Sequence, residues 1–114
     1  MKTVDLLTHA NGLPRRLTDD EARDMVRELA GMGGRIAYTA HARLRMQERD
    51  VSSEQVLNVL PRGQVVESAR WLTDRECWHL SLRALTAGDE VTVACAIEVE
   101  RLMGQVVAIV TAMA

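Results

Sequence analysis

The chain has 114 residues, a formal net charge of −2, a sequence pI of about 5.9 and 3% aromatic residues, with no phenylalanine. This length fits a single domain over residues 1–114 that buries a core without metal or disulfides. A duplex-DNA binder is usually strongly basic, and a single-strand platform stacks bases on exposed rings, so the composition disfavours both classes.

The first half of the chain has helical periodicity. After an N-terminal arm over residues 1–17, with a weak strand candidate at 3–7, Thr18 and Glu21 are spaced as a capping box. Apolar residues then recur at helical spacing, which predicts a helix at about 19–30. Residues 35–39 are a short extended piece. Thr39 is placed to cap a second helix at about 40–49, and Ser52 or Ser53 to cap a third, short helix. The helical part thus spans residues 18–60.

From residue 64 the apolar period changes to two, which predicts strands at 64–69, 76–85, 91–100 and 105–113. We therefore expect an α+β fold with two or three N-terminal helices packed on one face of a four-stranded antiparallel sheet, which occupies residues 64–113. The last strand carries no charge and would be unprotected as a sheet edge, so one expectation is a homodimer through residues 105–113.

The register of the sheet can be inferred from its two faces. With Gly88 and Asp89 at the centre of the hairpin turn, one face is entirely apolar, and the other places His79 opposite Glu98. Their Cβ atoms would lie about 4.5–5.5 Å apart. A carboxylate beside a histidine fixes its tautomer and raises its pKa, as a general acid–base pair needs.

The polar face also carries Ser81, Arg83 and Thr111 around the small residues Ala94 and Ala96, which together suggest a shallow trough. Arg83 and Thr111 could hold an anion such as a phosphate. The alternative interpretation is the solvated polar face of a half-buried sheet.

A second constellation lies on the predicted helix at 40–49. His41, Arg45 and Arg49 fall within an arc of about 80° at roughly 100° per residue, and three cation-capable groups on one stripe can bind phosphates. The alternative is a charged face that is merely solvated or paired.

Other features point away from metals, cofactors and export. His9, His41 and His79 lack metal-ligand spacing, so no metal and no cofactor is expected. Cys77 and Cys95 lie far apart and are expected to be buried free thiols, which suits a reducing compartment. The N-terminus lacks the apolar run of a signal peptide, and no stretch reaches the roughly 18 apolar residues of a membrane span. We therefore expect a cytoplasmic protein without membrane contact.

The run His41-Ala-Arg-Leu-Arg-Met46-Gln-Glu-Arg49-Asp-Val-Ser-Ser-Glu-Gln-Val56 resembles the signature of an uncharacterised bacterial domain family. The pattern is roughly H-A-x-x-R-M-x-x-R-x-(I/V)-(S/T)-x-x-x-(I/V). The closing Val-Ala-Ile-Val-Thr111 is similar to the last strand of that family, so the resemblance covers about residues 38–113 and leaves the first helix outside.

Members of that family resemble the RelE and barnase–EndoU–colicin group of small ribonuclease toxins. The resemblance implies a metal-independent ribonuclease with His41 or Glu98 as base and His79 as acid. Thr111 would belong to the same catalytic group, and Arg45, Arg49 and Arg83 would hold phosphates. The acidic pI, the few aromatics and the apolar last strand favour another hypothesis, a non-catalytic interaction or inhibitor protein on a RelE-like scaffold, with a protein partner. The remaining alternative is a small-ligand sensor.

Overall fold

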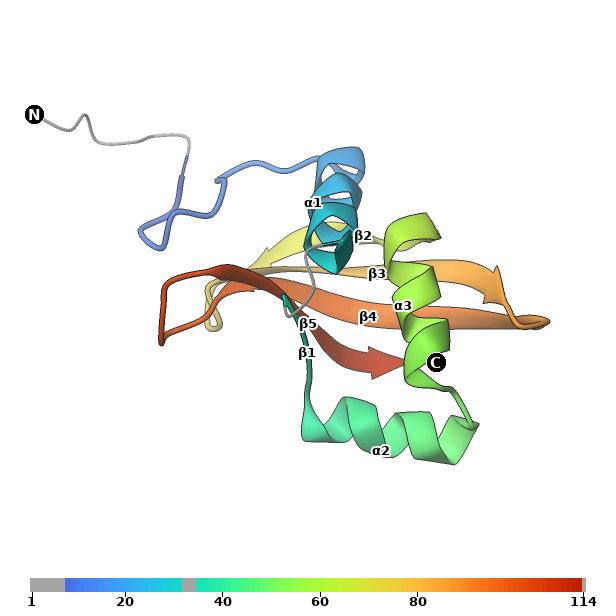
Figure 1. Ribbon diagram of the computed structural model, residues 1–114. Coiled ribbons are helices and arrows are strands. Elements are labelled where there is room, and N and C mark those ends of the chain that lie inside the picture. Colours follow the sequence, from blue (N-terminus) through green and yellow to red (C-terminus); the bar gives the residue numbers. More distant parts are fainter. Residues whose placement is uncertain (1–7, 32–34, 114) are drawn as a thin grey trace, which may run out of the picture.

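The computed structural model of the protein describes residues 8–31 and 35–113. The predicted strand at 3–7 lies outside the described residues. The elements follow in the order α1 (Asp19–Gly31), β1 (Ile36–Tyr38), α2 (Ala40–Arg49), α3 (Ser53–Arg62), β2 (Gln64–Leu72), β3 (Cys77–Thr86), β4 (Asp89–Val99) and β5 (Val106–Met113), as Figure 1 shows.

Side-chain caps fix where the helices begin. Thr18 and Glu21 form the predicted capping box, in which the Thr18 N–H donates to Glu21 Oε1 at 2.9 Å and the Glu21 N–H donates to Thr18 Oγ1 at 3.1 Å. The Thr39 hydroxyl accepts from the Ala42 N–H, and Ser52 forms a second capping box with Gln55. Within the part of the chain that the structure describes, no helix is long and apolar enough to cross a membrane.

The sheet has five strands in the order β1-β5-β4-β3-β2, rather than the four antiparallel strands predicted. The additional strand, β1, pairs in parallel with β5 through residues 36–38 and 108–110. Three residues are too few to show a period of two, and their partner lies about seventy residues further along the chain, so the sequence gives no local signal for this pairing.

This topology makes β5 an internal strand, not the open edge that motivated the expected homodimer. The Thr39 N–H donates to Val110 O at 3.0 Å, and the Thr39 hydroxyl donates to Thr111 O at 3.2 Å, so the chain continues to cover β5 beyond β1. A dimer through residues 105–113 stays a prediction, without its original reason.

The β3–β4 hairpin differs from the predicted register by two residues. Thr86 pairs with Asp89, so Ala87 and Gly88 form the centre of the turn, with φ of 52° and 83°. Glycine adopts a positive φ most readily, and in this turn Gly88 occupies the second of the two central positions. Because the offset is an even number, each side chain keeps its predicted face, but His79 pairs with Ala96 and not with Glu98.

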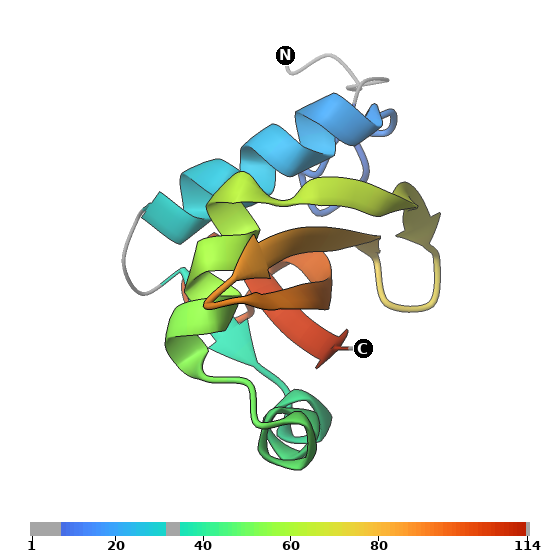
Figure 2. The ribbon, with the colours of Figure 1, turned by 90° about the vertical axis from the view of Figure 1, so that its right-hand side faces the viewer.

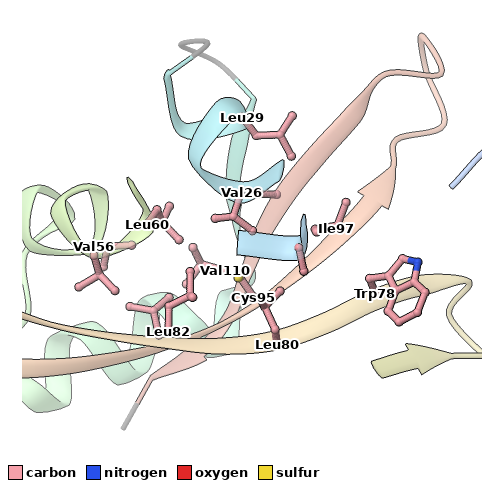
Figure 3. Close-up of a cluster of buried hydrophobic side chains, with 14 of the residues drawn as sticks. Val26, Leu29, Val56, Leu60, Trp78, Leu80, Leu82, Cys95, Ile97 and Val110 are labelled. Carbon is pink, nitrogen blue, oxygen red and sulfur yellow. The ribbon is translucent and has the colours of Figure 1, made fainter. Parts of the chain in front are cut away.

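Helices α1 and α3 cover one face of the sheet, and α2 lies beyond the edge formed by β1 (Figures 1 and 2). Apolar side chains from the helices and from the covered face of the sheet meet in one cluster (Figure 3). Its labelled members are Val26, Leu29, Val56, Leu60, Trp78, Leu80, Leu82, Cys95, Ile97 and Val110. The same views place no described helix over the other face of the sheet, so that face is free for polar residues.

The N-terminal arm packs against the same core. Leu13 is only 1% exposed, and the Trp78 indole N–H donates to Pro14 O at 2.8 Å. His9 stacks on Trp71 with 3.5 Å between ring centroids and 7° between ring planes. Residues 8–14 are therefore an integral part of the domain.

Candidate functional site

The open face of the sheet forms a trough with a floor of small residues. Ala94 and Ala96 lie on this face in β4, with His79 and Ser81 opposite them in β3. Although no helix among the described residues covers them, Ala96 is only 2% exposed and Ser81 only 7%. Longer side chains around them therefore shield the floor, and the predicted trough is present.

His79 and Thr111 meet across this floor. The distance from His79 Nε2 to Thr111 Oγ1 is 3.3 Å, and Thr111 Oγ1 also lies 3.2 Å from Ala94 O. An irregularity in the β4–β5 pairing between Ala94 and Cys95 places Thr111 here. A hydroxyl has one proton, so Thr111 donates either to Ala94 O, while accepting from His79, or to His79.

The carboxylate beside His79 is Glu67 of β2, not Glu98. His79 Nδ1 lies 3.8 Å from Glu67 Oε1, and the Ser81 hydroxyl donates to the same oxygen at 2.9 Å. Glu67, His79 and Thr111 thus form a chain of carboxylate, imidazole and hydroxyl across the sheet, which we call the triad. A histidine between a carboxylate and a hydroxyl is an arrangement that can move a proton.

Glu67 could not have been found from a period of two. Val65 pairs with the core residue Leu82, and regular alternation would put Glu67 on the same covered face. The pairing between β2 and β3 is irregular between Val65 and Glu67 and again before Arg70, so Glu67 instead pairs with Ser81 on the open face. A bulge of this kind leaves no pattern in a single sequence.

Burial sets the protonation of the triad. The His79 side chain is 16% exposed, and its burial lowers the pKa of the imidazole below the ordinary 6.5; the nearby Glu67 carboxylate opposes this shift, while Arg70 and Arg75 add to it. The lowered pKa keeps His79 neutral at pH 7. Its Nδ1 is buried and has no hydrogen-bond partner in the described part of the chain.

The other predicted residues of the polar face lie apart from the triad. Continuing the observed register puts Glu98 level with Cys77, so its predicted pairing with His79 is wrong. Arg83 donates through Nε to Thr92 Oγ1 at 3.0 Å and lies 3.6 Å from Glu90 Oε1, so it is engaged within its own hairpin.

The cationic arc of α2 begins near Thr111, because Thr39, the N-cap of α2, donates to Thr111 O. His41 and Arg49 are exposed, and Arg45 pairs with Glu48 at 3.3 Å. No hydrogen bond or ion pair among residues 8–31 and 35–113 joins this arc to His79. The two predicted constellations are thus linked through β5 but not through a side-chain contact.

Among the described residues, neither the cysteines nor any group of potential metal ligands forms a further site. Cys77 and Cys95 are buried and free, as predicted, and burial raises their pKa to about 11 and about 12. Across the described residues, no three His, Cys, Asp or Glu side chains are grouped so that they could hold a metal ion.

The fold and the site define a small α+β domain with a polar triad on the open face of its sheet. Residues 38–114 match the family described as Domain of unknown function (DUF4258), and the chain belongs to this family. The match spans the part of the chain whose sequence resembles an uncharacterised domain family, and it contains the whole triad but not the arm or α1. No curated protein and no solved structure matches the chain.

Proposed function

We propose that the triad is the acid–base site of a metal-independent ribonuclease of the toxin type that the sequence resemblance implies. The observation that carries the proposal is the chain from Glu67 Oε1 through His79 to Thr111 Oγ1, with distances of 3.8 and 3.3 Å, on a face of the sheet that the described helices leave open. This face is where a nucleic-acid strand would have access.

Cleavage of RNA by its own 2′-hydroxyl needs a base, an acid and cations for the charge that develops on the phosphorus oxygens. A neutral His79 can accept a proton through Nε2, directly or by way of the Thr111 hydroxyl. Glu67 then stabilises the imidazolium that forms, since it faces Nδ1. His41 is exposed near the same end of β5 and would serve as the acid.

Cations on two sides would hold the phosphate. Arg70 pairs with His79 across β2 and β3 and is exposed. On the other side, Arg45 and Arg49 extend along α2 from the point where Thr39 contacts Thr111. A phosphate between them would contact guanidinium groups, each of which can bind two phosphate oxygens through parallel hydrogen bonds.

The test is cleavage of RNA by the purified protein with a chelator present. His79→Asn should slow cleavage by about 10²- to 10⁴-fold, the usual contribution of a general acid or base. Glu67→Gln and Thr111→Val should slow it less. The matched controls are Glu28→Gln and Thr73→Val, which change exposed residues of the same types and should leave the rate unchanged. A folded wild-type protein that leaves every RNA intact would refute the catalytic proposal.

A second candidate function is a non-catalytic protein-binding module, and the β4–β5 turn favours it. Leu102 and Met103 are 90% and 74% exposed, and the Glu100 carboxylate accepts hydrogen bonds from both of their N–H groups. A rigid, exposed apolar pair is suited to a pocket on a protein partner. In this case Leu102→Ser with Met103→Ser would abolish partner binding, while His79→Asn would leave it intact.

A further inference from the structure

A cleft of about 550 Å³ opens at one end of the trough, away from α2. It is lined by Asn11 of the arm, Arg75 and Glu76 of the β2–β3 turn, Glu98 and Val99 at the end of β4, and Glu100, Arg101 and Gly104 of the β4–β5 turn. This volume lies in the range of small-molecule sites, roughly 300–1,000 Å³. The triad does not use any of these residues.

The walls of the cleft are held in place. The Glu100 carboxylate accepts from the N–H groups of Leu102, Met103 and Gln105 at 3.0, 2.7 and 3.2 Å, and these bonds lower its pKa. On the facing wall, the Asn11 side-chain amide donates to Glu76 O at 2.8 Å. The cleft is therefore preformed, as ligand sites usually are.

Four charged groups in the cleft are unengaged. Within the described part of the chain, the side chains of Arg75, Glu76, Glu98 and Arg101 make no hydrogen bond or ion pair, whereas the carboxylate of Glu100 accepts three hydrogen bonds from its own turn. Arg75, Glu76 and Arg101 are exposed, and Glu98 is half-buried. A ligand that engaged the two arginines and the half-buried Glu98 would carry an anion for the guanidiniums and hydrogen-bond donors for the carboxylate.

We propose that this cleft binds a nucleotide, with its phosphate between Arg75 and Arg101 and the donor edge of its base on Glu98. A guanidinium group can bind two phosphate oxygens through parallel hydrogen bonds, and an ionised carboxylate can only accept hydrogen bonds. Guanine has two adjacent donors, N1–H and the N2 amino group, that match the two oxygens of a carboxylate. Guanine should therefore be preferred over other bases. Because Glu76, Glu98 and Glu100 repel a bare anion, phosphate alone should bind weakly.

The cleft lies close enough to the triad to hold part of a longer strand. Glu98 is two residues along β4 from Ala96, the cross-strand partner of His79, which is roughly 7 Å along the strand. The same chemistry would thus fit a free nucleotide or a guanosine within RNA. The proposal concerns binding and does not depend on cleavage at the triad.

The test is titration of the protein with 5′-GMP, 5′-AMP, 5′-UMP, inorganic phosphate and a short RNA containing one guanosine. Binding is followed by calorimetry and by the amide NMR signals of Leu102 and Gly104. If the natural ligand is a free nucleotide, we expect 5′-GMP to bind most tightly of the free ligands. If it is a guanosine within RNA, we expect only the guanosine-containing RNA to bind. Glu98→Gln should weaken guanine binding by about tenfold, the usual effect of losing a charged hydrogen bond. Arg75→Ala with Arg101→Ala should weaken every phosphate-bearing ligand.

Controls separate this site from the proposed active site. Glu28→Gln and Arg16→Ala, both at exposed positions, should leave binding unchanged. The proposal is overturned if phosphate binds as tightly as 5′-GMP, if the Glu98 and arginine variants bind like the wild type, or if neither nucleotide nor RNA binds at millimolar concentration. RNA cleavage in the absence of such binding would also overturn it, while leaving the triad proposal intact.

Discussion

Leu13→Ala is expected to destabilise the protein by about 3 kcal/mol. Leu13 comes from the N-terminal arm, which the family match does not include, but its side chain is 1% exposed and lies in the core cluster. Truncating a fully buried leucine removes its transfer free energy and leaves a cavity, at a cost of about 2–5 kcal/mol. For a chain of this size, 3 kcal/mol corresponds to a fall in Tm of roughly 12 °C.

Urea denaturation followed by circular dichroism measures this change, with Leu102→Ala as the control. Leu102 is 90% exposed, so the same substitution there should alter the free energy of unfolding by less than about 0.5 kcal/mol. A cost below about 1 kcal/mol for Leu13→Ala would refute the conclusion that the arm is part of the domain, and the family-matched segment would then be expected to fold without it.

Two further predictions concern His79 and Gly63. Because folding lowers the pKa of His79, the unfolded chain takes up a proton first as the pH falls below 6.5, so the free energy of unfolding should decrease until the pH passes the folded-state pKa. His79→Asn should reduce this dependence in urea titrations between pH 5 and 8, and identical slopes for variant and wild type would contradict the assignment. Gly63→Ala should cost about 1–3 kcal/mol in the same assay, because an added Cβ would lie 2.7 Å from Val59 O and 2.9 Å from Leu82 Cβ. Gly31→Ala, where a Cβ would meet nothing within 4 Å, should not destabilise the protein.

Local chemistry made the helices predictable. Thr18 with Glu21, Thr39, and Ser52 with Gln55 cap the three helices as their spacing indicates. A cap depends only on residues a few positions apart, so a single sequence contains the whole signal. The period of two similarly predicted which side chains share a face, and an even-numbered register error could not disturb that result.

The composition of the site was only partly predictable. His79 and Thr111 were expected on one face, and their side chains meet there. Glu67 was missed and Glu98 was wrongly paired, because a bulge in β2 and the centre of a hairpin turn decide which residues face each other. Both depend on where the backbone turns or bulges, and the sequence alone is compatible with several such positions. Long-range pairing, such as that of β1 with β5, has no local signal at all.

The position of β5 inside the sheet has a consequence for synthesis and folding. Although β5 is the last of the described elements in sequence order, it lies between β1 and β4. Until residues 106–113 have been made, β1 has no partner strand and one edge of β4 stays open. Contacts between distant parts of a chain form slowly, and open strand edges in incomplete chains promote aggregation. A nascent chain of this protein thus completes its sheet only after residues 106–113 have been synthesised, and a truncation before residue 106 removes an internal strand rather than an edge strand.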